Sequence, residues 1–224
     1  MVNIPKHFLN EEQGFIEELE THPALRLKYN TLYPIILNKY KKKRYVETGL
    51  WLGHGIKVAL ACEFDLIYSC DIDSRSTSLG EKLYGHYKNV NIYHSDSREY
   101  LEMLFQNNEL TENVTFFLDA HFGDDATAKK LGGDFISPLL DEINLIAKYC
   151  KNKDNIIIID DYNKIEKWGH HKDKLESAVL SVNKNFKLNV QPRIVEEPAP
   201  PQWWNKNSDK QKLKTNGDFL IATL

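Results

Sequence analysis

The side chains with the clearest chemical potential in this sequence are acids at or just after the ends of short apolar segments. They are Glu47, Asp71, Asp96, Asp119 and the adjacent pair Asp160 and Asp161. If the segments are parallel strands, their carboxyl ends share one edge of a sheet, and open α/β sheets bind ligands at that edge. The pattern therefore predicts one site built from several strand ends.

The first of these acids opens a glycine-rich segment. Residues 45–55 read YVETGLWLGHG and contain Gly49, Gly53 and Gly55. A tight turn between a strand and a helix can bring bare backbone against a ligand, which glycine allows. The order of the glycines differs from the G-x-G-x-x-G of dinucleotide-binding folds, in which the helix N-terminus holds a pyrophosphate. An acid directly before the loop favours a cofactor that carries positive charge.

Apolar segments alternate with helical patterns along most of the chain, which predicts a doubly wound, Rossmann-like α/β sheet that is mostly parallel. Strands are expected near 45–48 and at 66–70, 90–93, 114–118, 156–159, 186–190 and 217–224, and helices at 56–62, 74–87, 98–107, 139–147 and 175–182. Residues 1–44 are expected to form helices that cover the core at 45–224. The whole chain, 1–224, is expected to be a single domain.

Composition narrows the function classes. With 29 basic and 32 acidic residues the formal net charge is −3, so no general positive field is available for nucleic acid. No apolar stretch is long enough to span a bilayer, and the three cysteines lack C-x-x-C spacing. We therefore expect a cytoplasmic protein with reduced thiols and no membrane or nucleic-acid partner. The N-terminal helices could pair two subunits in a homo-oligomer.

From Tyr45 to Leu224 the glycine loop and the strand-end acids resemble class I S-adenosylmethionine (SAM) methyltransferases. This resemblance implies seven strands, with the last one antiparallel. It also implies that Asp71 binds the two ribose hydroxyls of SAM, because a carboxylate offers two oxygens to a vicinal diol. Asp73 is the second choice for that role. The implied cofactor-binding residues are Glu47, Thr48, Gly49, Gly53 and Gly55 at the methionine part, Asp71 and Ile72 at the ribose, Asp96 and Ser97 at the adenine, and Asp119.

Asp119, Asp160 and Asp161 resemble the metal site of cation-dependent O-methyltransferases of the catechol and macrocin types. In the macrocin-type sugar enzymes the fifth strand similarly ends in Asp-Asp-Tyr. Three carboxylates at neighbouring strand tips would suit Mg²⁺. Alternatively, the acids cap the following helices or pair with Lys164 or Lys129.

The resemblance implies a SAM-dependent O-methyltransferase, assisted by a divalent metal, that acts on a hydroxyl of a sugar, a glycan, a small polyol or a catechol. A base must take the hydroxyl proton, and His121, two residues after Asp119, is the candidate because imidazole titrates near neutrality. His170 and His171 lack metal-helix spacing and are interpreted as a solvated loop.

Two other functions compete with this one. Asp71-Ile72-Asp73 is a D-x-D sequence, which can hold a metal and a nucleotide sugar in a glycosyltransferase. That function leaves the glycine loop without a role. A non-enzymatic binding module is the other alternative. Residues 191–216 are expected to form a long loop, in which Trp203 and Trp204 favour a lid over a ligand.

Overall fold

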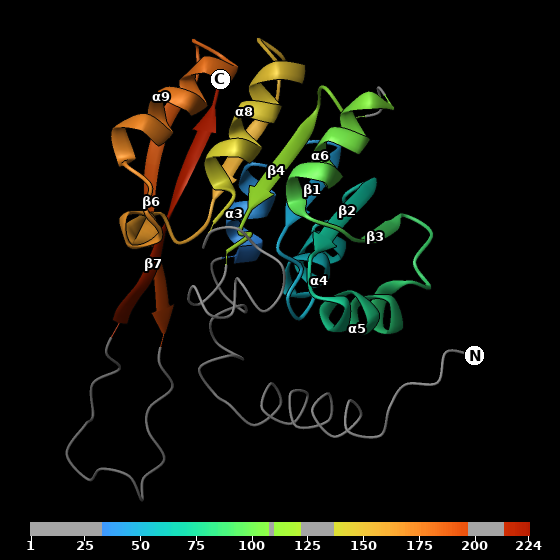
Figure 1. Ribbon diagram of the computed structural model, residues 1–224. Helices are drawn as coiled ribbons and strands as arrows, with labels where there is room; N and C mark the ends of the chain where they lie inside the picture. The colour runs from blue at the N-terminus through green and yellow to red at the C-terminus, as the bar shows by residue number, and fades with distance from the viewer. Residues whose placement is uncertain (1–32, 108–109, 122–136, 197–212) are drawn as a thin grey trace, which may run out of the picture.

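The computed structural model describes residues 33–107, 110–121, 137–196 and 213–224 and shows a sheet with helices on both faces (Figure 1). The elements are α3 (Tyr33–Lys39), β1 (Arg44–Thr48), α4 (His54–Ala61), β2 (Leu66–Asp71), α5 (Ser74–Tyr84), β3 (Val90–His94), α6 (Ser97–Gln106), β4 (Val114–Leu118), α8 (Leu139–Tyr149), β5 (Ile156–Ile159), the 3₁₀ helix η1 (Tyr162–Trp168), α9 (Lys172–Val182), β6 (Lys187–Glu196) and β7 (Leu213–Thr223). Every strand predicted from the sequence is present.

The sheet has seven strands in the order β3-β2-β1-β4-β5-β7-β6. The pairs among β1 to β5 are parallel, whereas β7 is antiparallel to both β5 and β6. Helices on connections between parallel strands return the chain to the same sheet edge. The predicted Rossmann-like class, with an antiparallel last strand, is confirmed.

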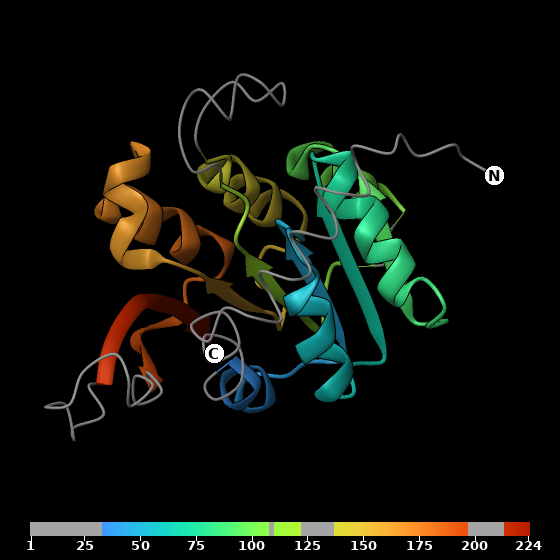
Figure 2. The same cartoon turned by 90° about the horizontal axis from the view of Figure 1, so that it is seen from below.

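Alternate side chains of each strand serve two separate cores, as the pleat of a strand requires. On β4, Phe116 packs with α6, α8 and α9, and its neighbour Phe117 packs on the face covered by α3 and α4. Figure 2 shows α3 and α4 on one side of the sheet and α8 and α9 on the other. All five residues of β4 are buried because both faces are covered.

The register aligns the carboxyl ends of the central strands. Thr48 lies opposite Cys70 on one side and Leu118 on the other. Hydrogen bonding continues past the strand ends, since the Asp119 amide donates to the Thr48 carbonyl at 3.1 Å and the Asp160 amide donates to the Leu118 carbonyl at 3.1 Å. The acids at the end of β2 and after β4 and β5 consequently lie at one edge, the lower edge of the sheet in Figure 1, whereas Glu47 lies within β1.

The C-terminal strands are longer than the sequence predicted. β6 reaches Glu196 and β7 begins at Leu213, so both ends of the expected 191–216 loop belong to a hairpin. A register shift between Pro192 and Ile194 accommodates the proline on this edge strand. Trp203 and Trp204, which favoured a lid, lie outside the described residues, as do residues 1–32 of the N-terminal cover.

Cys62, Cys70 and Cys150 are buried free thiols. Within the described ranges, no helix is both long and apolar enough to cross a membrane.

Candidate functional site

The glycine loop packs directly on the chain segment after β4. Gly49 has φ +86°, and a Cβ there would lie 2.7 Å from the Asp119 carbonyl oxygen. Gly53 begins α4 with φ +73°, and its Cβ would meet the ring of Tyr84 at 2.5 Å. Both positions combine a left-handed backbone with a close contact, which together demand glycine. The loop is therefore held at the sheet edge by internal packing.

The Glu47 carboxyl points into the protein beneath the start of α4. The Tyr45 hydroxyl donates to Oε1 at 3.0 Å and the Ser69 hydroxyl donates to Oε2 at 2.5 Å. A Cβ on Gly55 would lie 1.5 Å from Oε1, so this glycine makes room for the carboxyl. The side chain is 2% exposed, and burial raises its pKa to about 8. Contact of Glu47 with the methionine part of SAM stays a prediction.

This raised pKa predicts a pH-dependent stability that Glu47→Gln removes. The ordinary pKa is 4.5 and the folded value is about 8, so the folded protein holds a proton that the unfolded chain releases between these values. Stability therefore falls as pH rises through that window. Between pH 5 and pH 8 the wild type should lose on the order of 3 kcal/mol of its free energy of unfolding through Glu47. Glu47→Gln does not titrate and should not show this loss, so it gains that amount relative to the wild type. Denaturant unfolding at both pH values measures this gain. The exposed Glu102→Gln should show no such gain, and parallel curves for Glu47→Gln and the wild type would contradict a protonated Glu47.

Asp71 fixes the turn after β1. Its Oδ2 accepts the Trp51 amide at 2.7 Å and its Oδ1 accepts the Asp73 amide at 2.8 Å. Burial raises its pKa, and these two backbone hydrogen bonds oppose that shift. Each carboxylate oxygen can accept more than one hydrogen bond, so Asp71 retains capacity for a diol. The carbonyl of the neighbouring Ile72 accepts a hydrogen bond from His94 Nε2 at 3.0 Å.

Asp73 and Asp96 share one local role. Each precedes Ser-Arg, begins a helix and accepts the amide of the arginine two residues later, Arg75 at 2.9 Å and Arg98 at 2.8 Å. Each also pairs with the guanidinium of that arginine. For Asp73, burial raises the pKa but the Arg75 hydrogen bonds and charge outweigh it; for Asp96, the Arg98 hydrogen bond is the largest cause of a lowered pKa. Asp73 thus serves as a helix cap.

His121 lies between two of the predicted acids. Its Nε2 is 3.5 Å from Asp119 Oδ1 and 4.0 Å from Asp161 Oδ2. Its ring stacks on Trp168 with centroids 4.1 Å apart and planes at 22°. Lys164 donates to Asp161 Oδ2 at 2.8 Å. The structure therefore unites Asp119, His121 and Asp161 and adds Lys164 and Trp168 from η1.

The predicted metal set does not form a metal-binding arrangement here. Asp160 is 6% exposed, and its Oδ1 accepts the Asp161 amide at 2.6 Å. Lys164 balances the charge of Asp161. The sequence offered this pairing as the alternative to a metal. Lys129, the other lysine named in that alternative, lies outside the described residues. Among the residues that the structure describes, no three His, Cys, Asp or Glu side chains are arranged to hold a metal ion. This geometry does not fit Mg²⁺.

The structure adds Glu142, which sequence reasoning missed. It lies on α8 with 0% exposure, and burial raises its pKa to about 7. The Ser97 and Thr48 hydroxyls lie near enough to lower that pKa, although no hydrogen bond of ordinary geometry joins them to the carboxyl. The sequence did contain a signal for this buried acid. Glu142 lies on the apolar stripe of α8, three residues after Leu139 and one before Ile143.

Comparison with known proteins agrees with this architecture. The sequence matches no protein-family model and no curated protein. An O-methyltransferase from Bacillus cereus, solved in complex with SAH, is 12% identical and aligns over 100% of this chain and 93% of its own with a TM-score of 0.56. The O-methyltransferase TomG from Streptomyces achromogenes, in complex with SAM, is 10% identical. It aligns over 100% of this chain and 92% of its own with a TM-score of 0.56. A SAM-dependent methyltransferase from Archaeoglobus fulgidus is 15% identical. It aligns over 94% of this chain and 99% of its own with a TM-score of 0.55.

The chain thus has the fold of class I SAM-dependent methyltransferases, as its sequence resemblance predicted. At these identities the likeness concerns the fold alone. The choice of acceptor depends on the chain's own residues.

Proposed function

We propose that this protein is a SAM-dependent O-methyltransferase that acts on a hydroxyl of a sugar, a glycan or a small polyol. The observation that carries the proposal is a sheet shared with SAM-dependent O-methyltransferases over nearly the whole chain. Its carboxyl edge brings Gly49 against Asp119, with Asp71 one strand away.

The residues at this edge suit SAM. Asp71 would hold the ribose hydroxyls, and Thr48 with the Gly49 turn would face the methionine part. Asp96 and Ser97, at the start of α6, would lie at the adenine edge. When bound, SAM supplies a methyl group on a positively charged sulfur. Acids around the site favour that charge electrostatically.

His121 would take the proton of the acceptor hydroxyl as the oxygen forms its new bond to the methyl carbon and the carbon–sulfur bond breaks. Asp119, 3.5 Å from Nε2, stabilises the resulting imidazolium. Trp168 holds the ring by stacking and is a positioning residue. No step of this proposal passes through a metal.

The glycosyltransferase alternative is weaker because its D-x-D acids have other roles. Asp73 caps α5 and pairs with Arg75, and Asp71 accepts two loop amides. Neither arrangement presents two open carboxylates to a metal-bound diphosphate.

A cytoplasmic location and a homo-oligomer stay predictions from the sequence.

Asp71→Asn tests the cofactor assignment. The amide keeps the shape but loses charge and one acceptor, so SAM affinity should fall about 10- to 100-fold, since hydrogen bonds to a charged group contribute about 1.5–3 kcal/mol. Calorimetric titration with SAM measures this loss, and Asp154→Asn, at the opposite edge of the sheet, is the control. Wild-type protein that binds a nucleotide sugar but not SAM would overturn the proposal.

The acceptor class and the metal are tested in a methyl-transfer assay on small sugars and oligosaccharides. Because the described arrangement of Asp119, Asp160 and Asp161 does not fit Mg²⁺, we expect transfer to persist in EDTA; loss of transfer in EDTA and its recovery on added Mg²⁺ would instead support the metal predicted from the sequence. Full activity in EDTA would refute the metal and leave Lys164 as the cation at Asp161.

A further inference from the structure

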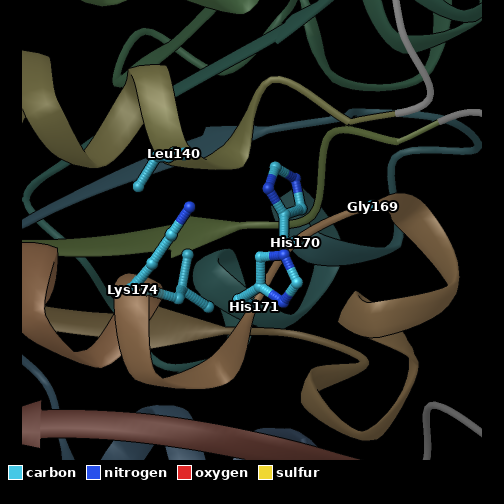
Figure 3. A pocket seen from close by; sticks show the side chains of 6 residues that line it. Leu140, Gly169, His170, His171 and Lys174 are labelled. Atoms are coloured by element: carbon cyan, nitrogen blue, oxygen red, sulfur yellow. The ribbon is translucent and has the colours of Figure 1, made fainter.

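A hollow of about 120 Å³ lies between the start of α8 and the start of α9. Its lining consists of Leu140, Gly169, His170, His171, Lys174 and Leu175. Figure 3 shows Lys174 on one side of this space and the two imidazoles on the other. The volume is several times what one water molecule needs. Three of the six lining residues are basic and none is acidic.

His170 carries the strongest indication of a ligand. Its Nε2 is fully buried and has no hydrogen-bond partner among the described residues, while the ring makes another hydrogen bond, to the backbone of Ser137. A buried nitrogen without a partner is costly, and such groups commonly await a ligand or water. Burial lowers the pKa of this imidazole. His170 lies in the loop before α9, as the sequence indicated, and the residue is partly exposed although its Nε2 is buried.

The other contributions to the hollow also favour an anion. His171 directly precedes α9, which spans 11 residues, and its side chain makes no capping hydrogen bond. The first amides of a helix attract negative charge. A Cβ on Gly169 would have no atom within 4 Å, so the backbone here is open to an incoming group.

Two acids near the hollow do not cancel this positive character. Asp141 acts on His170 through its charge, but its carboxylate is 54% exposed and lies 3.8 Å from the Arg98 guanidinium. Asp173 lies in the first turn of α9 and does not line the hollow.

The hollow adjoins the candidate methyl-transfer site. His170 comes two residues after Trp168, which stacks on His121. On the other side, Ser137, whose backbone bonds His170, donates its hydroxyl to the Ala120 carbonyl at 3.3 Å. Ala120 lies between Asp119 and His121 in the chain. A molecule bound at His121 could thus extend a charged group toward the hollow.

We propose that His170, His171 and Lys174 bind a phosphate group carried by the acceptor, so that the acceptor is a phosphorylated sugar or polyol. This identification of the acceptor rests on the proposed O-methyltransferase function, whereas the anion site itself does not. The Lys174 ammonium supplies the positive charge for an oxyanion, and imidazole N–H groups and the first amides of α9 are further hydrogen-bond donors at the hollow.

Binding of inorganic phosphate to the full-length protein tests the site without any methyl transfer. Titration followed by the NMR signals of the histidine rings should show saturable shifts of His170 and His171. Lys174→Met should weaken phosphate binding about tenfold or more and leave SAM affinity unchanged, because Lys174 is exposed and lies outside the cofactor edge. Lys172→Met is the matched control, since Lys172 Nζ lies 5.0 Å over the Tyr162 ring and does not line the hollow.

The outcomes separate the two proposals. Saturable phosphate binding that depends on Lys174 supports the anion site even if no sugar is methylated. Equal phosphate affinity in wild type, Lys174→Met and Lys172→Met, or a stronger response to acetate than to phosphate, overturns it. Where methyl transfer occurs, a phosphorylated sugar should have a lower KM than the same sugar without phosphate, and Lys174→Met should erase that difference. Equal KM values for the two sugars would overturn the acceptor assignment alone.

Discussion

Gly55→Ala is expected to destabilise the fold by about 3 kcal/mol. The added Cβ would lie 1.5 Å from Glu47 Oε1 and 2.8 Å from the Tyr45 hydroxyl. The carboxyl cannot easily retreat, because Tyr45 and Ser69 hold one oxygen each. Denaturant unfolding and the yield of soluble protein measure the effect.

Gly169→Ala is the control for this substitution. Gly169 also has a left-handed backbone, at φ +84°, but a Cβ there meets nothing within 4 Å. It should cost only about 1 kcal/mol, from backbone strain. The double variant Glu47→Ala/Gly55→Ala should recover part of the lost stability, because it removes the colliding carboxyl. A Gly55→Ala variant as stable as Gly169→Ala would contradict the packing of Glu47 against α4.

His121→Gln is expected to lower the rate of methyl transfer about 10²- to 10⁴-fold, the usual contribution of a general base. Glutamine can still donate a hydrogen bond toward Asp119, so the local structure should persist, but it cannot accept a proton. SAM affinity should change little, and the pH profile of turnover should change in shape. Steady-state rates across pH, together with SAM titration, provide these measurements.

His86→Gln is a matched control, because His86 also packs against an aromatic ring, with its centroid 4.1 Å from that of Tyr87, but lies on the exposed surface. It should leave turnover and its pH profile unchanged. Trp168→Leu should reduce turnover less than His121→Gln, since Trp168 acts by holding the ring. Wild-type turnover with an unaltered pH profile in His121→Gln would remove His121 from the mechanism.

Some side-chain placements could have been predicted from the sequence. Tyr45 and Glu47 are two residues apart on one strand, so both face the layer under α4, and Glu47 had to share that layer with Gly55. The repeated Asp-Ser-Arg at Asp73 and Asp96 likewise signals two helix caps, because the spacing lets each carboxylate meet the arginine amide.

The sequence by itself determined the sheet and the edge at which the site lies. Apolar runs as short as Val114–Leu118 and Ile156–Ile159 favour strands buried on both faces over helices, and parallel strands deliver the residues after their carboxyl ends to a common edge. Only the tertiary structure decided which charges meet there. Whether Asp161 faces a metal, Lys164 or His121 depends on how η1 folds back over the edge, and no local pattern encodes that. The hollow beside it likewise exists only because Leu140 of α8 and Lys174 of α9, far apart in the chain, pack side by side.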